Sequence, residues 1–147
     1  MATPLFTLSC DKLSNATLVG FRGKEQISRP YEFEVFFTVP AGTAVRPAVG
    51  ERATLKGART SDGEPFAIHG VIAGVKLLLQ MPDGALYGAL VVPRLWLLRH
   101  FARSYVFTFK KLKDFLSETL EAGGLTSSDY RFPIDEGARD DAEFVAQ

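Results

Sequence analysis

The sequence is poor in the residues that build disulfides and metal clusters, and it lacks the long apolar run of a membrane span. Its 147 residues include one cysteine, Cys10, two histidines and one tryptophan. A single cysteine excludes an internal disulfide and cannot by itself supply a thiolate metal cluster. No stretch approaches ~20 uninterrupted apolar residues, and the N-terminus lacks the basic start and apolar run of a secretory signal. We therefore expect a chain that is cytoplasmic at synthesis and does not bind a membrane directly.

The chain also lacks an excess of charge of either sign. Seventeen basic and seventeen acidic residues give a net charge of zero, so no extended field is available to hold a phosphate backbone. Basic and aromatic residues interleave only at the short run 107–113, which we interpret as a solvated helix entry or a subunit contact. We expect no nucleic-acid partner. The 46% of hydrophobic residues is enough to fill one sizeable core.

Residues Tyr31 to Val39 show the clearest strand pattern. The odd positions are all apolar, whereas Glu32, Glu34 and Thr38 occupy the other face with Phe36 as the exception. Because side chains alternate between the faces of a strand, one side of this segment is expected to meet a core. Five further segments have strand patterns: Pro4 to Ser9, Ala16 to Arg22, Arg52 to Lys56, Phe66 to Gln80 and Ala85 to Val92.

Turn residues separate these segments. Ser61 to Glu64 and Met81 to Gly84 contain Asp-Gly, which predicts two hairpins. Gly20 to Lys24 is also expected to be a hairpin turn, since it lacks the frame of a phosphate-binding loop. Gly70 and Gly74 interrupt a long strand, where each predicts a bulge or bend that lets a sheet curl into a barrel.

Helical spacing begins after residue 110. Apolar residues recur through Leu112 to Ala122, and Gly123-Gly124 predicts the C-terminal stop, although no preferred N-cap precedes this helix. Asp140 to Gln147 has the pattern of a second helix start, with Asp140 as cap and Glu143 three positions later. Barely two turns are present, so the native polypeptide is expected to extend beyond Gln147.

No catalytic or metal motif is present. The sequence has no H-E-x-x-H, no pair of C-x-x-C and no Gly-x-Ser-x-Gly, and its acidic residues near 135 and 140 are interpreted as capping groups. His69 lies beside Gly70 in a strand pattern and His100 follows an apolar run, which favours structural roles for both. We therefore expect no enzyme activity, no cofactor and no metal site.

Four ordered segments resemble the N-terminal region of the VgrG family, the trimeric spike proteins of type VI secretion, which are related to the hub of contractile phage tails. The segments are Ser28-Arg29-Pro30-Tyr31-Glu32-Phe33-Glu34-Val35, His69-Gly70-Val71-Ile72, Leu90 to Leu98, and Lys113-Asp114-Phe115-Leu116 with Gly123-Gly124-Leu125. The opening Leu5 to Leu8 and the later Asp141-Ala142-Glu143-Phe144 also fit. The resemblance spans most of the chain.

The resemblance implies a mainly β fold with one or two helices (α+β), an antiparallel β-barrel of the tail-hub type followed by a helix. Residues 1–108 would form the first hub barrel, and 109–147 a helix, a loop and the start of a second helix leading toward a second barrel. It also implies a homotrimer that contacts the tail tube protein and baseplate components and leaves the cell as part of the injection machine. The interface candidates are Tyr31, Phe33, Trp96, Phe115 and Phe144.

Two other functions remain open at this stage. The chain could be a standalone small β-barrel binding module derived from such a hub, which a stable monomer would favour. It could also be a metal-assisted hydrolase that uses His69, His100 and a carboxylate. The hydrolase requires these side chains to share one ion at about 2.0–2.2 Å.

Overall fold

The computed structural model describes residues 6–58, 65–101, 104, 106–133 and 142–146. The chain divides into two compact units, Met1–Pro93 and Arg94–Gln147. The domain boundary predicted after residue 108 lies inside the second unit.

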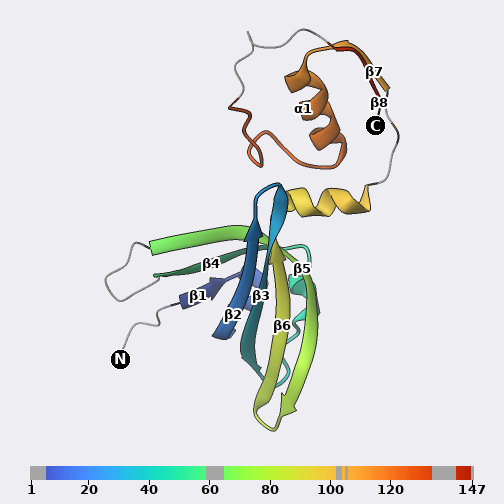
Figure 1. The fold of residues 1–147 in the computed structure, drawn as a ribbon. Helices are drawn as coiled ribbons and strands as arrows, with labels where there is room; N and C mark the ends of the chain where they lie inside the picture. Colours follow the sequence, from blue (N-terminus) through green and yellow to red (C-terminus); the bar gives the residue numbers. More distant parts are fainter. Residues whose placement is uncertain (1–5, 59–64, 102–103, 105, 134–141, 147) are drawn as a thin grey trace. The chain divides into compact units, whose positions relative to one another are not determined.

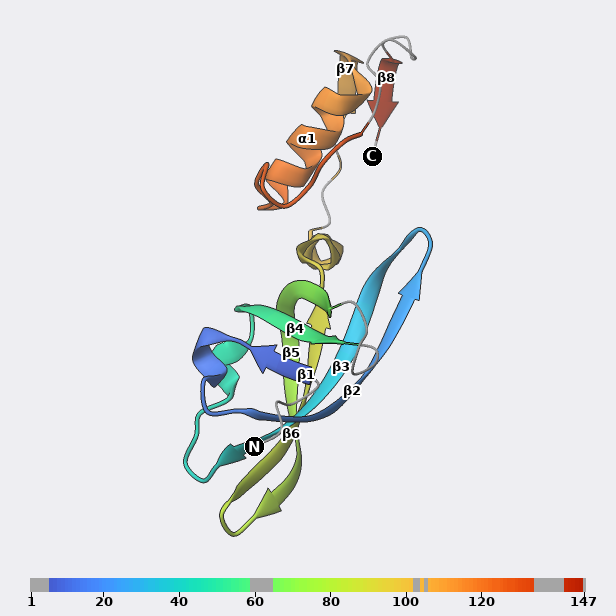
Figure 2. The same cartoon turned by 90° about the vertical axis from the view of Figure 1, so that its left-hand side faces the viewer.

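The first unit is built on one antiparallel sheet (Figures 1 and 2). Its six described strands are β1 (Phe6–Ser9), β2 (Thr17–Gln26), β3 (Arg29–Pro40), β4 (Arg52–Ala58), β5 (Pro65–Met81) and β6 (Gly84–Val92). They are ordered β1-β4-β5-β6-β3-β2, and two short 3₁₀ helices, η1 (Asp11–Leu13) and η2 (Arg46–Ala48), connect them. The predicted mainly β architecture is therefore confirmed.

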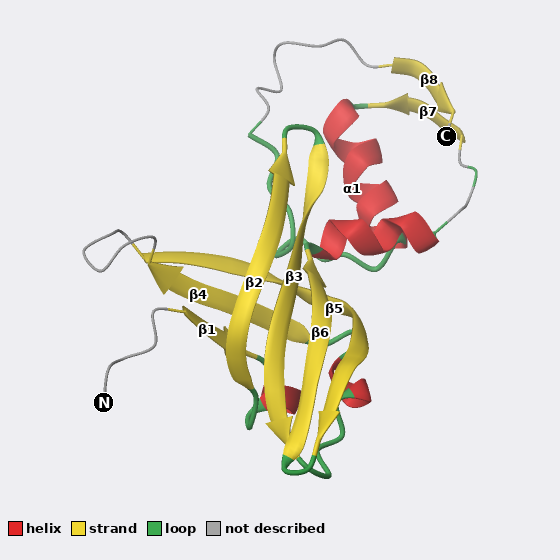
Figure 3. Ribbon diagram, turned by 60° about the horizontal axis from the view of Figure 1, so that its bottom comes forward, coloured by secondary structure: helices red, strands yellow, loops and turns green. Residues whose placement is uncertain are grey.

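The sheet curls so that its two end strands approach each other. β1 and β2 occupy opposite ends of the strand order, yet the two strands lie near each other in the fold (Figure 3). The rings of Phe6 on β1 and Phe21 on β2 meet edge to face with centroids 5.1 Å apart. No ladder joins β1 to β2 within the described residues, so side chains close this seam of the barrel.

The core lies on the inner face of the curled sheet. Alternate residues of β3 point to this face and are buried. Val35 and Phe37 are fully buried, and Phe33 and Val39 are 6% and 4% exposed. In chain order, Phe33, Val35, Phe37 and Val39 pair with Val91, Ala89, Tyr87 and Ala85 of β6, so the side chains of these β6 residues lie on the same face. Burial of these apolar side chains is the main favourable term for folding of this unit.

Two-residue turns connect β2 to β3 and β5 to β6. Pro82 and Asp83 join β5 to β6 between the paired residues Met81 and Gly84, as the Asp-Gly pattern predicts. At Gly84, the carbonyl oxygen of Val39 occupies the space of a side chain, so glycine is required. The other predicted turn, Ser61 to Glu64, lies outside the described residues.

The bend predicted near Gly74 is present. Ala73 is an extra residue of β5 between the pairs Ile72–Val91 and Gly74–Leu90, which makes a β-bulge. Gly70 has a different role: it pairs regularly with Ala53, and the Val92 carbonyl approaches too closely for a Cβ.

The hairpin turn predicted at Gly20 to Lys24 is wrong. These residues lie within β2, and the turn follows at Ile27 and Ser28. Gly23 pairs with Phe33 of β3, and the ring of Phe33 fills the space that a side chain at Gly23 would need. Its glycine therefore reflects close packing across the sheet and not a turn.

The second unit contains the predicted helix. α1 spans Leu112–Ala122, preceded by the 3₁₀ helix η3 (Arg94–His100) and by strand β7 (Val106–Lys110). Lys111 occupies the N-cap without a side-chain hydrogen bond, as expected. At the other end, Gly124 has φ +85°, and the amide of Leu125 donates to the carbonyl of Leu120 at 3.1 Å. This is a Schellman-type stop that buries Leu125.

The second helix predicted over Asp140 to Gln147 is wrong. Ala142–Ala146 forms strand β8, which pairs antiparallel with β7, while Asp140, Asp141 and Gln147 lie outside the described residues. Two turns of helix are marginal by themselves, whereas a partner strand supplies backbone hydrogen bonds to a segment that contains Phe144 and Val145.

Candidate interaction surfaces

Strand β6 is apolar on both of its faces. Ala85, Tyr87, Ala89 and Val91 face the core, and the alternate residues Leu86, Gly88 and Leu90 lie on the outer face. When an antiparallel sheet packs against a core on one face and meets water on the other, the residues on the water-facing side are mostly polar. The outer face of β6 is therefore suited to contact with another surface.

Leu78 and Leu79 of β5 extend this apolar outer face, whereas Leu77 pairs with Tyr87 on the inner side of the sheet. Leu77, Leu78 and Leu79 are 48%, 41% and 55% exposed. The ladder between β4 and β5 ends at the pair Arg52–Val71, so within the described strands residues 73–81 have β6 as their one strand neighbour. An apolar strand with a free edge is a typical site of association with another chain.

A groove of about 510 Å³ crosses the outer face beside these leucines. Gly74, Gly88 and Leu78 lie along one part of it, and charged residues of β2 and β3 form the opposite wall. Arg22 pairs with Glu34 across the two strands, and its guanidinium lies 5.9 Å from the ring centroid of Phe36. Lys76 of β5 also lines the groove, so the mainly apolar side carries one cation and the opposite wall carries both signs of charge.

The tip of the β2–β3 hairpin is another exposed apolar feature. Ile27 is 96% exposed, and Ser28 has φ +62°, a left-handed conformation that is uncommon for a residue with a side chain. Both residues lie between the paired Gln26 and Arg29.

In the second unit, η3 carries a cluster of aromatic and basic side chains. The Arg99 guanidinium lies 4.5 Å from the ring centroid of Trp96, and the His100 ring meets Trp96 edge to face at 5.5 Å. Leu95 and Phe101 on and beside the same helix are 48% and 45% exposed. Tryptophan and arginine are frequent hot-spot residues at protein interfaces.

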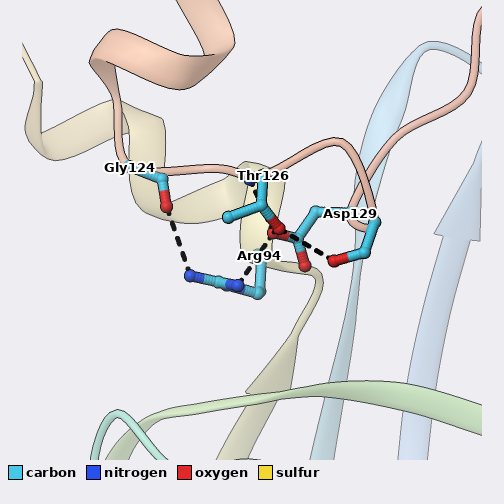
Figure 4. A network of polar contacts seen from close by, with 5 residues as sticks. Arg94, Gly124, Thr126 and Asp129 are labelled. Atoms are coloured by element: carbon cyan, nitrogen blue, oxygen red, sulfur yellow. Dashed lines mark hydrogen bonds and ion pairs between the residues drawn. The ribbon is translucent and has the colours of Figure 1, made fainter.

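A polar network holds η3 to the loop that follows α1 (Figure 4). The Asp129 carboxylate accepts hydrogen bonds from the backbone amide and the hydroxyl of Thr126, each at 2.8 Å. Arg94 donates to the same carboxylate at 2.8 Å and to the Gly124 carbonyl at 3.3 Å. The Thr126 hydrogen bonds, assisted by Arg94, hold the pKa of Asp129 below its ordinary value, although burial acts in the opposite direction.

The predicted interface residues have different surroundings. Phe33 lies in the core, and Tyr31 at its edge donates a hydrogen bond to the backbone carbonyl of His69. Burial and, secondarily, the charge of Glu25 raise the pKa of Tyr31. Trp96 on η3 and Phe115 on α1 are partly exposed, and Phe144 lies in β8, with its side chain outside the described part. Contact of these five residues with another subunit stays a prediction.

The two candidate catalytic histidines and the cysteine lie in different local surroundings. His69 Nδ1 lies 3.1 Å from the hydroxyl of Thr54, His100 contacts Trp96, and Cys10 is buried in the core. Within the described ranges, no group of three His, Cys, Asp or Glu side chains could hold a metal ion. None of the described helices is both long enough and apolar enough to cross a membrane.

Sequence reasoning did not single out the three leucines of β5. The available signal was their consecutive order, because three apolar residues in a row place at least one on the outer face of a strand. The bulge at Leu78 shifts the register, so Leu79 pairs with Leu86 and joins the outer face.

Comparisons with known proteins agree with this fold. A family model described as phage tail baseplate hub (GPD) matches residues 24–147. Among solved structures, the c3393 protein of E. coli is similar, with 20% sequence identity and a TM-score of 0.72 over 96% of this chain. That protein is described as a component of the type VI secretion system with structural similarity to the T4 bacteriophage tail proteins gp27 and gp5. This chain covers 38% of the length of c3393. A search of curated protein sequences found no significant match to this chain.

Proposed function

Because the chain belongs to the phage tail baseplate hub (GPD) family, we propose that it is a structural component of the hub of a contractile injection machine. It acts by assembly with other subunits and not by catalysis. The proposal includes a homotrimer, contact with the tail tube protein and baseplate components, and delivery out of the cell with the machine. The six strands β1–β6, within residues 1–108, form the first hub barrel.

The observation that carries this proposal is the apolar outer face of β5 and β6. Large apolar side chains exposed beside a free strand edge are typical of proteins that associate with a partner, and Leu78 and Leu79 of β5 lie in this position. Burial of each half-exposed leucine against a partner would contribute about 1 kcal/mol. Further apolar surface from Leu86 and Leu90 lies on the same face.

The role in the machine is tested by peptide mass spectrometry on contractile tail particles purified from the source cells. Peptides of this sequence are expected in the particles at a constant ratio to tube and baseplate proteins. If the peptides occur only in the soluble fraction, the chain is a standalone binding module and the hub function is wrong.

The trimer is tested by light scattering on the purified protein over a range of concentrations. We expect a shift from monomer to trimer, and Leu79→Asp should shift the equilibrium back toward monomer. Val49→Asp is the matched control, because Val49 is 44% exposed in the same unit but lies outside β5 and β6. A monomer at every concentration would contradict the trimer.

A further inference from the structure

An aromatic groove lies at the seam between β1 and β2. Phe6, Phe21, Phe33 and Phe66 line it together with Ile68, and its volume is about 490 Å³. The seam has no strand ladder in the described residues, so side chains form both walls. Phe33 is 6% exposed and forms the buried side, whereas the other three phenylalanines are partly exposed.

The phenyl rings meet at steep angles. Phe6 makes angles of 72° with Phe21 and 50° with Phe66, and Phe21 lies at 60° to Phe66, with centroids 5.1 to 6.4 Å apart. In an edge-to-face pair the edge of one ring lies against one face of the other ring, so the two rings do not stack face on face. The face of an aromatic ring carries partial negative charge and attracts cations.

Glu25 adds a full negative charge to this groove. Of the described residues that line the groove, Glu25 is the one with a charged side chain. It lies on β2 where the register with β3 shifts, opposite Pro30 and Tyr31, and proline has no amide to continue the ladder. The charge of Glu25 also contributes to the raised pKa of Tyr31, whose ring contacts Phe33. The carboxylate therefore acts on the same aromatic cluster.

We propose that this groove binds the side chain of a lysine or arginine from a partner polypeptide, with its apolar stem on the phenyl rings and its cation beside Glu25. Charge complementarity supports this occupant, because ring faces and a carboxylate both attract a cation. A long basic side chain also buries its methylene groups while its charged end stays near solvent. The choice of a protein partner rests on the proposed function, whereas the cation site itself does not.

Titration of the purified protein, followed by NMR of its backbone amides and phenylalanine rings, tests the site. The probe is N-acetyl-lysine methylamide, with N-acetyl-norleucine methylamide as the uncharged match and tetramethylammonium as a free cation. The lysine compound is expected to shift the signals of Phe6, Phe21, Phe66 and Glu25. Norleucine and tetramethylammonium should bind more weakly.

Two variants make the test specific. Glu25→Gln keeps the shape of the side chain and removes its charge, so it should weaken binding of the lysine compound about tenfold. Glu32→Gln is the matched control, since Glu32 lies on the outer face of the same hairpin, and it should leave the affinity unchanged.

Three results would overturn the proposal. Equal binding of the norleucine compound would show a merely apolar groove, and equal or tighter binding of tetramethylammonium would show a site for free cations. Absence of shifts with the lysine compound would remove the site. Each of these results leaves the hub function standing, because the titration uses the isolated chain. Absence of the chain from tail particles would leave the cation site standing.

Discussion

The phenyl ring of Phe33 on β3 occupies the space that a side chain at Gly23 of β2 would need. The two residues pair in register, and the ring of Phe33 is buried in the core of the first unit. Glycine at position 23 is therefore part of the packing of the barrel, and it brings the buried ring close to the backbone of an edge strand.

Gly23→Ala should destabilise the first unit by about 1–3 kcal/mol, because the added methyl group overpacks the site and displaces a buried ring. Urea denaturation measures the change in the free energy of unfolding. Gly20→Ala on the same strand is the control, since a Cβ there meets no atom within 4 Å. Equal losses for the two variants would contradict the role assigned to Phe33.

Phe36 and Phe37 are neighbours in sequence but lie on opposite faces of β3. Phe37 is fully buried, so Phe37→Ala should cost about 3–5 kcal/mol of stability. Phe36 is partly exposed on the outer face, and Phe36→Ala should cost clearly less in the isolated chain. Chemical denaturation of both variants checks the difference, and a larger loss for Phe36 would show that the outer face is already covered.

Asp129 should make the second unit sensitive to acid. Its folded-state pKa is lowered mainly by hydrogen bonds from Thr126, so its stabilising contribution is present above the unfolded pKa of about 3.9. The contribution is lost as the pH falls through the folded pKa. Asp129→Asn should therefore lower the melting temperature at pH 7, with a difference from the native protein that shrinks below about pH 4.

Thermal unfolding followed by far-UV circular dichroism at several pH values measures this effect. Thr126→Ser keeps both the amide and the hydroxyl donor and should retain the native acid dependence. If the difference in melting temperature between the native protein and Asp129→Asn does not change with pH, the charge of Asp129 does not contribute to stability.

The left-handed conformation of Gly124 should matter for the end of α1. Gly124→Ala is expected to destabilise the helix end by about 1–2 kcal/mol, because a Cβ is unfavourable at positive φ. Gly124→Asn should cost less, since asparagine tolerates this conformation better. Hydrogen exchange of the α1 amides compares the two variants, and equal protection in both would contradict the assigned cause.

Elements with a strong local pattern were predictable in this chain. The alternation of Tyr31 to Val39 identified β3 and its buried face, and helical spacing with Gly123-Gly124 identified α1 with its observed bounds. The ordered segments along the chain also identified the tail-hub fold that the family match supports. Each of these signals depends on residues close in sequence or on the order of segments.

Features that depend on distant residues were not predictable. From the sequence alone Gly23 resembles a turn residue, but in the structure it makes room for the ring of Phe33. Similarly, the sequence before Ala142–Ala146 resembles a helix start, but the segment pairs with β7 as a strand. The exposed leucines of β5 and the aromatic groove at the β1–β2 seam likewise arise from strand order and bulges.

The sequence by itself determined the mainly β class, the buried face of β3, the helix Leu112–Ala122 and its glycine stop. Local backbone preferences and side-chain periodicity act within a few residues, so they can be seen in the chain alone. The tertiary structure alone decided which glycine makes a turn, which terminal segment becomes a strand, and where aromatic rings meet Glu25. Those outcomes depend on contacts between residues far apart in sequence, whose energies override weak local propensities.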